Sequence, residues 1–129
     1  MEPITRSNLI ARLLEAVPEF QADPEDVRDN LTYLVFNNLA RFVCSLIENR
    51  NHEELLHRVF GFIEDATRTQ DHEIKEILRD SLNELAIQHP ESAESYMGPH
   101  TRRIFQMTRE DVYGGASVVR TIGDFIKRL

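Results

Sequence analysis

The feature that most constrains this fold is a run of apolar residues at helical spacing between Leu31 and Ile47. Steps of three and four residues place most of them on one face of a helix with 3.6 residues per turn. The apolar set is Leu31, Leu34, Val35, Phe36, Leu39, Ala40, Phe42, Val43, Cys44, Leu46 and Ile47. Only Asn37, Arg41 and Glu48 leave a clear polar strip. Because a helix that is apolar nearly all round must be covered on several sides, we expect this segment to be a central helix.

The same periodicity continues along the chain, and no stretch alternates apolar and polar residues for long enough to form a strand. The sequence therefore predicts an all-α fold of about six helices in a single domain, residues 1–129. The expected helices are residues 8–17, 31–48, 51–66, 71–89, 99–107 and 117–129, with a further helix start at 23–25. Asn51 and Asp71 are expected to cap the helices that follow them, and Pro90 to end the helix before it.

The linkers after residues 48 and 66 are only a few residues long, so three successive helices must lie antiparallel to their neighbours. Two architectures satisfy that condition. One is an antiparallel helical bundle, and the other is a short right-handed helical stack of the HEAT or armadillo kind. The hand of the third helix distinguishes them, and the sequence leaves both open. No motif recurs at a fixed period, so a true repeat array is not expected.

The segment HEELLH, residues 52–57, looks like a zinc-protease signature. Such a site needs His-Glu-x-x-His, whose two histidines lie four residues apart on one helix face. Here His52 and His57 are five residues apart and diverge by roughly 140° around a helix, so one zinc ion cannot bind both. Glu54 and His57 form one Glu-x-x-His pair of the kind used in di-iron bundles, but the chain has no second pair. The sequence therefore predicts no metal site.

Other catalytic signatures are also missing from the sequence. It has no Gly-rich phosphate loop, no Gly-x-Ser-x-Gly and no cysteine beside a marked activating histidine. Cys44 lies in the most apolar helix and is expected to be an inert core thiol. As the one cysteine of the chain, it excludes an internal disulfide and fits a reducing compartment. We therefore expect no catalytic residues, no cofactor and no enzyme activity.

The charge of the chain limits its partners. The net charge is −7, with 9 Lys/Arg against 19 Asp/Glu in residues 1–98 and 6 against 3 in residues 99–129. An acidic body repels phosphate backbones, so nucleic-acid binding is not expected. No apolar run approaches the roughly 18 residues that a membrane span needs, and the N-terminus has no signal-peptide pattern. The expected location is the cytoplasm.

One charged pattern suggests a partner surface on the third central helix. Four of its acidic residues follow steps of three, four and four and share one strip about 80° wide. They are Glu73, Glu76, Asp80 and Glu84. Lys75 and Arg79 project from the opposite flank, Ile87 lies within the strip, and Glu64 ends the preceding helix close by. The strip is either a solvated face, as most charge runs are, or a surface that binds a basic protein.

Two longer segments add a family resemblance. The run LARFVCSLIENRNHEELLHRVFGFIEDATRTQDHEIKEILRDSLNELA and the later YMGPHTRRIF resemble a bacterial domain family of uncharacterised function. Its pattern is a helix, a short polar turn, F-x-x-I-E, D-x-E-I, L-x-E-L and then a G-P before a basic turn. The resemblance covers about residues 31–105 and depends on helical positions together with Glu64, Glu84, Gly98 and Pro99. Some members of the family are predicted immunity proteins of polymorphic-toxin systems.

The resemblance implies a non-catalytic, protein-binding function in which the chain binds and neutralises a basic toxin. The toxin-facing surface would then be the acidic strip together with Glu64. For Glu64 and Glu84 the alternative is an internal role, bonding arginine side chains or helix ends. A competing function from a different class is a helical scaffold or homo-oligomer-forming module, whose apolar surfaces bind a permanent partner.

Overall fold

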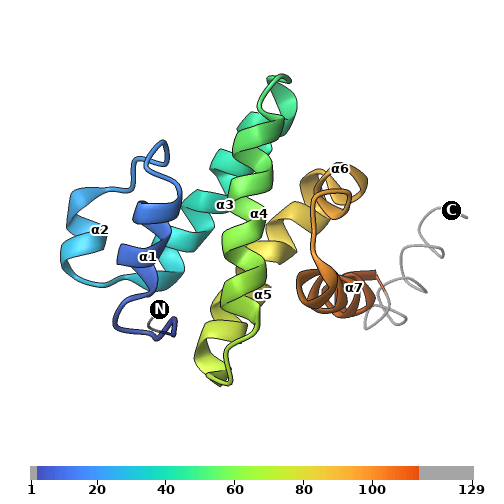
Figure 1. Ribbon diagram of the computed structural model, residues 1–129. Helices are drawn as coiled ribbons and strands as arrows, with labels where there is room; N and C mark the ends of the chain where they lie inside the picture. The colour runs from blue at the N-terminus through green and yellow to red at the C-terminus, as the bar shows by residue number, and fades with distance from the viewer. Residues whose placement is uncertain (1–2, 114–129) are drawn as a thin grey trace, which may run out of the picture.

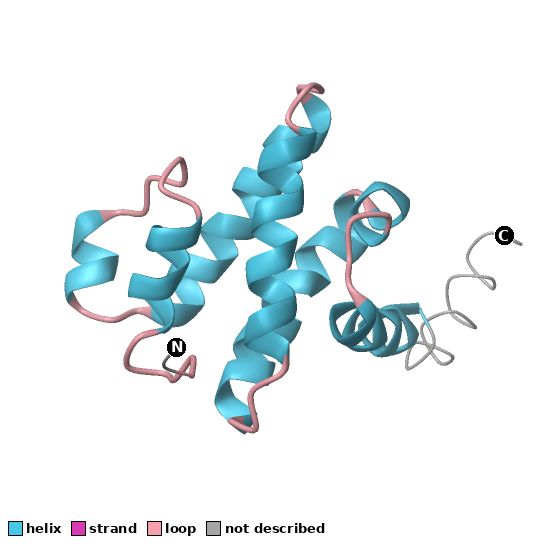
Figure 2. Ribbon diagram, in the orientation of Figure 1, coloured by secondary structure: helices cyan, strands magenta, loops and turns pink. Residues whose placement is uncertain are grey.

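The computed structural model describes residues 3–113, with the side chains of residues 3–108. This part of the chain consists of seven α-helices and contains no strand, which confirms the all-α prediction (Figures 1 and 2). The helices are α1 (Leu9–Ala16), α2 (Pro24–Arg28), α3 (Thr32–Glu48), α4 (Glu53–Thr67), α5 (His72–Gln88), α6 (Pro90–Glu94) and α7 (Pro99–Tyr113).

Helices α3, α4 and α5 form the centre of the molecule, with α1 and α2 on one side and α6 and α7 on the other (Figure 1). Helix α4 crosses in front of the other two and runs antiparallel to both, as the short linkers predicted. Behind it, α3 and α5 pack side by side and run parallel. The Ser81 hydroxyl donates to the Phe36 carbonyl at 2.8 Å, and His89 Nε2 lies 3.0 Å from Glu48 Oε1. These contacts hold the two helices together from the first half of α3 to its end.

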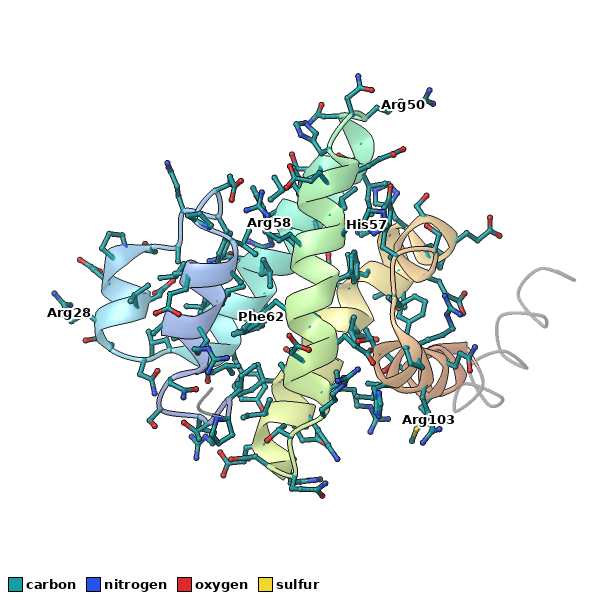
Figure 3. The ribbon with its side chains drawn as sticks, viewed as in Figure 1. Arg28, Arg50, His57, Arg58, Phe62 and Arg103 are labelled. Atoms are coloured by element: carbon teal, nitrogen blue, oxygen red, sulfur yellow. The ribbon has the colours of Figure 1, made fainter. Side chains whose placement is uncertain are left out.

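The interior is filled by aliphatic and aromatic side chains from α1, α3, α4, α5 and α7. The largest fully buried ones are Phe36, Phe60, Phe105, Leu9, Leu13, Leu39, Ile74, Ile77, Leu78, Leu82, Leu85 and Val17. Each such side chain contributes roughly 1.5–3 kcal/mol relative to an exposed one. Outside this core, Arg58 of α4 reaches Glu19 with two guanidinium nitrogens, at 2.6 and 2.8 Å, and so attaches the segment after α1 to the centre (Figure 3).

The apolar arc of α3 is narrower than the sequence predicted. Leu31 and Leu34 are 41% and 50% exposed, so their assignment to the buried face was wrong. Leu31 is the N-cap residue of α3, so it lies outside the helical turns and its side chain does not follow the helical spacing. Leu34 is seven residues before Arg41, two helical turns away, and therefore projects from the polar strip rather than the core. The core face of α3 is centred on Val35, Phe36, Leu39 and Val43, with Leu46 at its end.

The two predicted helix caps had different outcomes. Asp71 caps α5 as predicted, because one of its carboxylate oxygens accepts hydrogen bonds from the N–H groups of Glu73 and Ile74 at 2.9 and 3.4 Å. Asn51 does not cap α4. Arg50 and Asn51 have φ values of 42° and 68°, and this left-handed turn places His52, which makes no side-chain cap bond, at the N-cap position.

The C-terminal part also departs from the prediction. Pro90 ends α5 as expected, but it also begins α6, a short helix that the sequence did not predict. Pro in the first turn suits a helix start because its missing N–H would have no partner there. Helix α7 begins at Pro99 as predicted and continues to Tyr113 rather than ending near residue 107. The predicted turn at 114–115 and last helix at 117–129 lie outside the described residues.

Candidate functional site

The HEELLH segment takes no part in a metal site in the structure. His52 precedes α4, and the ring of the exposed His57 packs against the Tyr96 ring in a T-shaped arrangement, with 5.0 Å between the centroids. Within residues 3–108 no three His, Cys, Asp or Glu side chains are grouped so that they could hold a metal ion. In the same part of the chain, no helix has both the length and the apolarity needed to cross a membrane.

The predicted acidic strip lies on the flank of the buried face of α5, as the helical spacing indicated. Glu73 and Asp80 are exposed, and Glu76 and Glu84 are half-buried. At the N-terminal end of the strip, Glu73 Oε2 pairs with Arg6 Nη1 at 2.5 Å. Glu76 Oε1 lies 3.8 Å from His72 Nε2, one turn earlier in the helix. The first two carboxylates of the strip therefore have neighbours of positive or titratable charge.

Asp80 and Glu84 differ from these two. Neither forms an ion pair or a side-chain hydrogen bond with any residue whose side chain the structure describes. Asp80 lines a hollow of about 250 Å³ with Glu76, Arg79 and Asn83 of α5, Tyr33 of α3 and Thr108 of α7. Glu84 lies near Cys44 of α3. Burial raises the pKa of the Cys44 thiol, and the carboxylates of Glu48 and Glu84 raise it further. The internal alternative for Glu84, a bond to an arginine or a helix end, has no counterpart among these residues.

Exposed apolar side chains flank the two carboxylates. Tyr33 of α3, 48% exposed, lies beside Glu76 and Asp80, and Ile87, 52% exposed, follows Glu84 at the C-terminal end of the strip. Because α3 and α5 run parallel and in contact, these side chains belong to one continuous surface of the two helices. We name it the α3–α5 face and define it as Tyr33, Glu76, Asp80, Glu84 and Ile87. It combines carboxylates with an aromatic ring beside them and an aliphatic group at one end.

Glu64, the fifth predicted site residue, is not part of this face. It is 8% exposed in the interior between α4 and α7. One carboxylate oxygen accepts bonds from the N–H and hydroxyl of Thr101, both at 2.9 Å. The other accepts from the N–H and ring Nδ1 of His100, at 3.1 and 2.8 Å. Glu64 thus binds a helix end internally, which is the alternative that the sequence left open for it.

The geometry around Glu64 is that of a helix cap supplied from another helix. An N-cap side chain normally accepts from the N–H groups two and three positions into the helix, and here the α7 cap residue is Gly98, which has no side chain. Pro99 needs no acceptor. The Glu64 carboxylate lies where a cap oxygen would, and a Cβ on Gly98 would be 2.6 Å from Glu64 Cδ.

These bonds also determine the charge state of Glu64. Burial alone would raise the pKa of this carboxyl group. The hydrogen bonds from Thr101 and His100 stabilise the ionised form more strongly and lower its pKa to about 2. The sequence left open a helix-end role for Glu64 but did not indicate that His100 and Thr101 are its partners. The only sequence signal for this contact was that Glu64, Gly98 and Pro99 all occur in the family pattern. Their positions in the sequence did not indicate that the three residues lie together in the fold.

Comparison with known proteins identifies the family and no closer relative. A family model described as a domain of unknown function, DUF7674, matches residues 10–114. This confirms the resemblance to a domain family of unknown function and corrects its extent, because the match begins in α1 rather than near residue 31. Neither the curated proteins nor the solved structures gave a match.

Proposed function

The chain belongs to the DUF7674 family, and we propose that it is a non-catalytic protein-binding module that captures a basic protein through the α3–α5 face. The observation that supports this most is the pair of carboxylates at Asp80 and Glu84, which form no ion pair among the described side chains and lie near the exposed Tyr33 and Ile87. Arg79 lines the same hollow as Asp80 without forming an ion pair with it. Cations of a partner would relieve the repulsion between like charges that the folded chain holds close together.

Both chemical components of the face suit protein recognition. Tyrosine is enriched at binding hot spots because its ring covers a large area and its hydroxyl stays hydrogen-bonded. Carboxylates at the edge of an interface mainly raise the association rate and the selectivity for a partner of opposite charge. A net charge of −7 on the chain extends that attraction beyond the face itself.

The finer proposal is that the partner is a toxin encoded at the same locus and that the chain is its immunity protein. The resemblance to predicted immunity proteins supports this choice, as does the acidic charge of the chain, since a basic toxin would bind such a surface rapidly.

The test is to co-express this chain with the product of the adjacent reading frame and to measure complex formation by light scattering after size exclusion. We expect a stoichiometric complex and survival of cells that the adjacent product alone would kill. The double substitution Asp80→Lys with Glu84→Lys should abolish both. The matched control is Glu15→Lys with Asp65→Lys, two exposed carboxylates in the groove between α1 and α4, which should change neither. Equal loss in both variants, or no complex with the wild type, would refute the proposal.

The second candidate function, a scaffold that forms homo-oligomers, is favoured by a different observation. Leu31, Tyr33 and Leu34 are exposed together at the start of α3. Sedimentation of the purified chain over a concentration series separates the two functions. The binding module is expected to be a monomer at all concentrations, whereas a scaffold would form a dimer or larger species that Leu34→Glu dissociates.

A further inference from the structure

A second hollow lies on the other flank of α5, between α5 and α7, and has a volume of about 350 Å³. Two of its cations, Lys75 and Arg79, come from α5, and the third, Arg103, projects from α7 (Figure 3). The volume falls at the lower end of the range for small-molecule sites, about 300–1,000 Å³. We name this hollow the α5–α7 groove.

The charge of the groove is opposite to that of the chain as a whole. Glu76 is the one carboxylate among the residues that line it, against three permanent cations. Lys75 and Arg103 form no ion pair with any residue in the described part of the chain, although the protein has 22 acidic side chains. Two cations that come from different helices and face one hollow favour the binding of an anion, because neither is held in an ion pair with a described residue and together with Arg79 they outnumber the one carboxylate, Glu76.

The groove also has an apolar part. Ile104 and Met107 of α7 contribute to its wall, and Met107 is 54% exposed. An exposed methionine adapts its flexible side chain to the shape of a bound group. Small-molecule sites typically combine such apolar surface with a few convergent polar groups that fix the orientation of the ligand.

We propose that the α5–α7 groove binds a small organic anion in which a phosphate or carboxylate head is joined to an apolar body. Lys75 and Arg103 hold the head from opposite walls, and Ile104 and Met107 contact the body. This site shares Glu76 with the α3–α5 face, but the cations that would hold the anion, Lys75 and Arg103, are not part of that face. The proposal does not depend on the function proposed for the face.

The test is a titration of the full-length chain, followed by amide NMR at constant ionic strength, with phenyl phosphate, benzoate and inorganic phosphate as probes. With phenyl phosphate, benzoate or both, we expect saturable chemical-shift changes confined to α5 and α7. The anion that binds more tightly identifies the preferred head group, phosphate or carboxylate. Inorganic phosphate, which lacks the body, should bind more weakly. Scattered or non-saturating shifts with both aromatic anions would overturn the proposal.

Charge reversals decide whether the two walls act together. Lys75→Glu and Arg103→Glu should each weaken the tighter probe about tenfold or more, the loss of one hydrogen bond to a charged group. The control is Arg41→Glu, an exposed arginine of α3 outside the groove, which changes the net charge equally and should leave the affinity unchanged. An equal loss in the control, or no loss in either groove variant, would contradict the assignment. Circular dichroism confirms that each variant is folded.

Discussion

At the scale of single residues, Glu64 and Gly98 depend on each other. The carboxylate occupies the space next to Gly98 in which any other residue would place its Cβ. Four hydrogen bonds from His100 and Thr101 hold the carboxylate there, so it cannot turn aside without losing them. The motif residues Glu64, Gly98 and Pro99 are thus one structural device that attaches the start of α7 to α4.

The first prediction concerns this pair. Gly98→Ala should lower the free energy of unfolding by about 1–3 kcal/mol, the cost of leaving buried polar groups unpaired. In a Glu64→Ala background the same substitution should cost much less, so a double-mutant cycle in urea should show strong coupling. The control is Gly61→Ala in α4, where a Cβ meets nothing within 4 Å, which should raise stability by about 0.5–1 kcal/mol. Additive effects of the two substitutions at 64 and 98 would contradict the account.

The second prediction is a pH dependence. The pKa of Glu64 is about 2 in the folded chain against an ordinary value of 4.5, so the unfolded chain binds the proton more readily between these values. Its contribution, about 3 kcal/mol at 1.36 kcal/mol per pKa unit, is therefore complete above pH 4.5 and is lost as the pH falls towards 2. The stability difference between wild type and Glu64→Gln should shrink over this window in urea unfolding. A difference that stays constant from pH 7 to pH 2 would show that ionised Glu64 has no such role.

Glu64 also shows what the sequence could and could not predict at this scale. Helical spacing was enough to place Glu73, Glu76, Asp80 and Glu84 on one strip, because side-chain direction within a helix depends only on position. The partners of Glu64, which are His100 and Thr101, lie 36 and 37 residues further along the chain. No local pattern distinguishes a carboxylate that accepts four hydrogen bonds from one that is exposed to solvent.

At the scale of elements, the sequence predicted helix existence better than helix ends. Asp71 was predicted correctly as a cap because an Asp before a helical pattern accepts from the first turn whatever surrounds it. The prediction that Asn51 caps α4 was wrong because Arg50 and Asn51 both adopt positive φ, and the tight turn between α3 and α4 requires that conformation. The end of α7 was placed too early because contacts with α4 and α5, rather than local propensity, support that helix.

The third prediction tests the assigned roles of two aspartates in the same helix. Asp71→Ala should lower the free energy of unfolding by about 1 kcal/mol, since it removes the cap of α5. Asp80→Ala, on the exposed side of the same helix, should change stability by less than about 0.5 kcal/mol. Thermal and urea unfolding of the two variants measure this directly. A large loss at Asp80 would mean that it has a structural role rather than being available to a partner.

At the scale of the whole molecule, the antiparallel order of α3, α4 and α5 followed from short linkers, but the contact between α3 and α5 did not. That contact depends on pairs far apart in the chain, such as Ser81 with Phe36 and His89 with Glu48. It brings Tyr33 beside the α5 strip and so creates the α3–α5 face. The sequence predicted four of the five residues of that face as acidic or apolar members of the strip, and it assigned Tyr33 to no role.

The central claim is that the α3–α5 face binds a basic protein, and the most direct measurement is the association rate constant as a function of salt concentration. For the captured partner, the wild type should associate fast at low salt and more slowly as salt screens the charges, over a Debye length of about 10 Å at 0.1 M. Asp80→Lys with Glu84→Lys should reduce both the association rate constant at low salt and its dependence on salt. Glu15→Lys with Asp65→Lys should retain most of the rate constant at low salt and most of its salt dependence. Identical salt curves for the two double variants would contradict the claim.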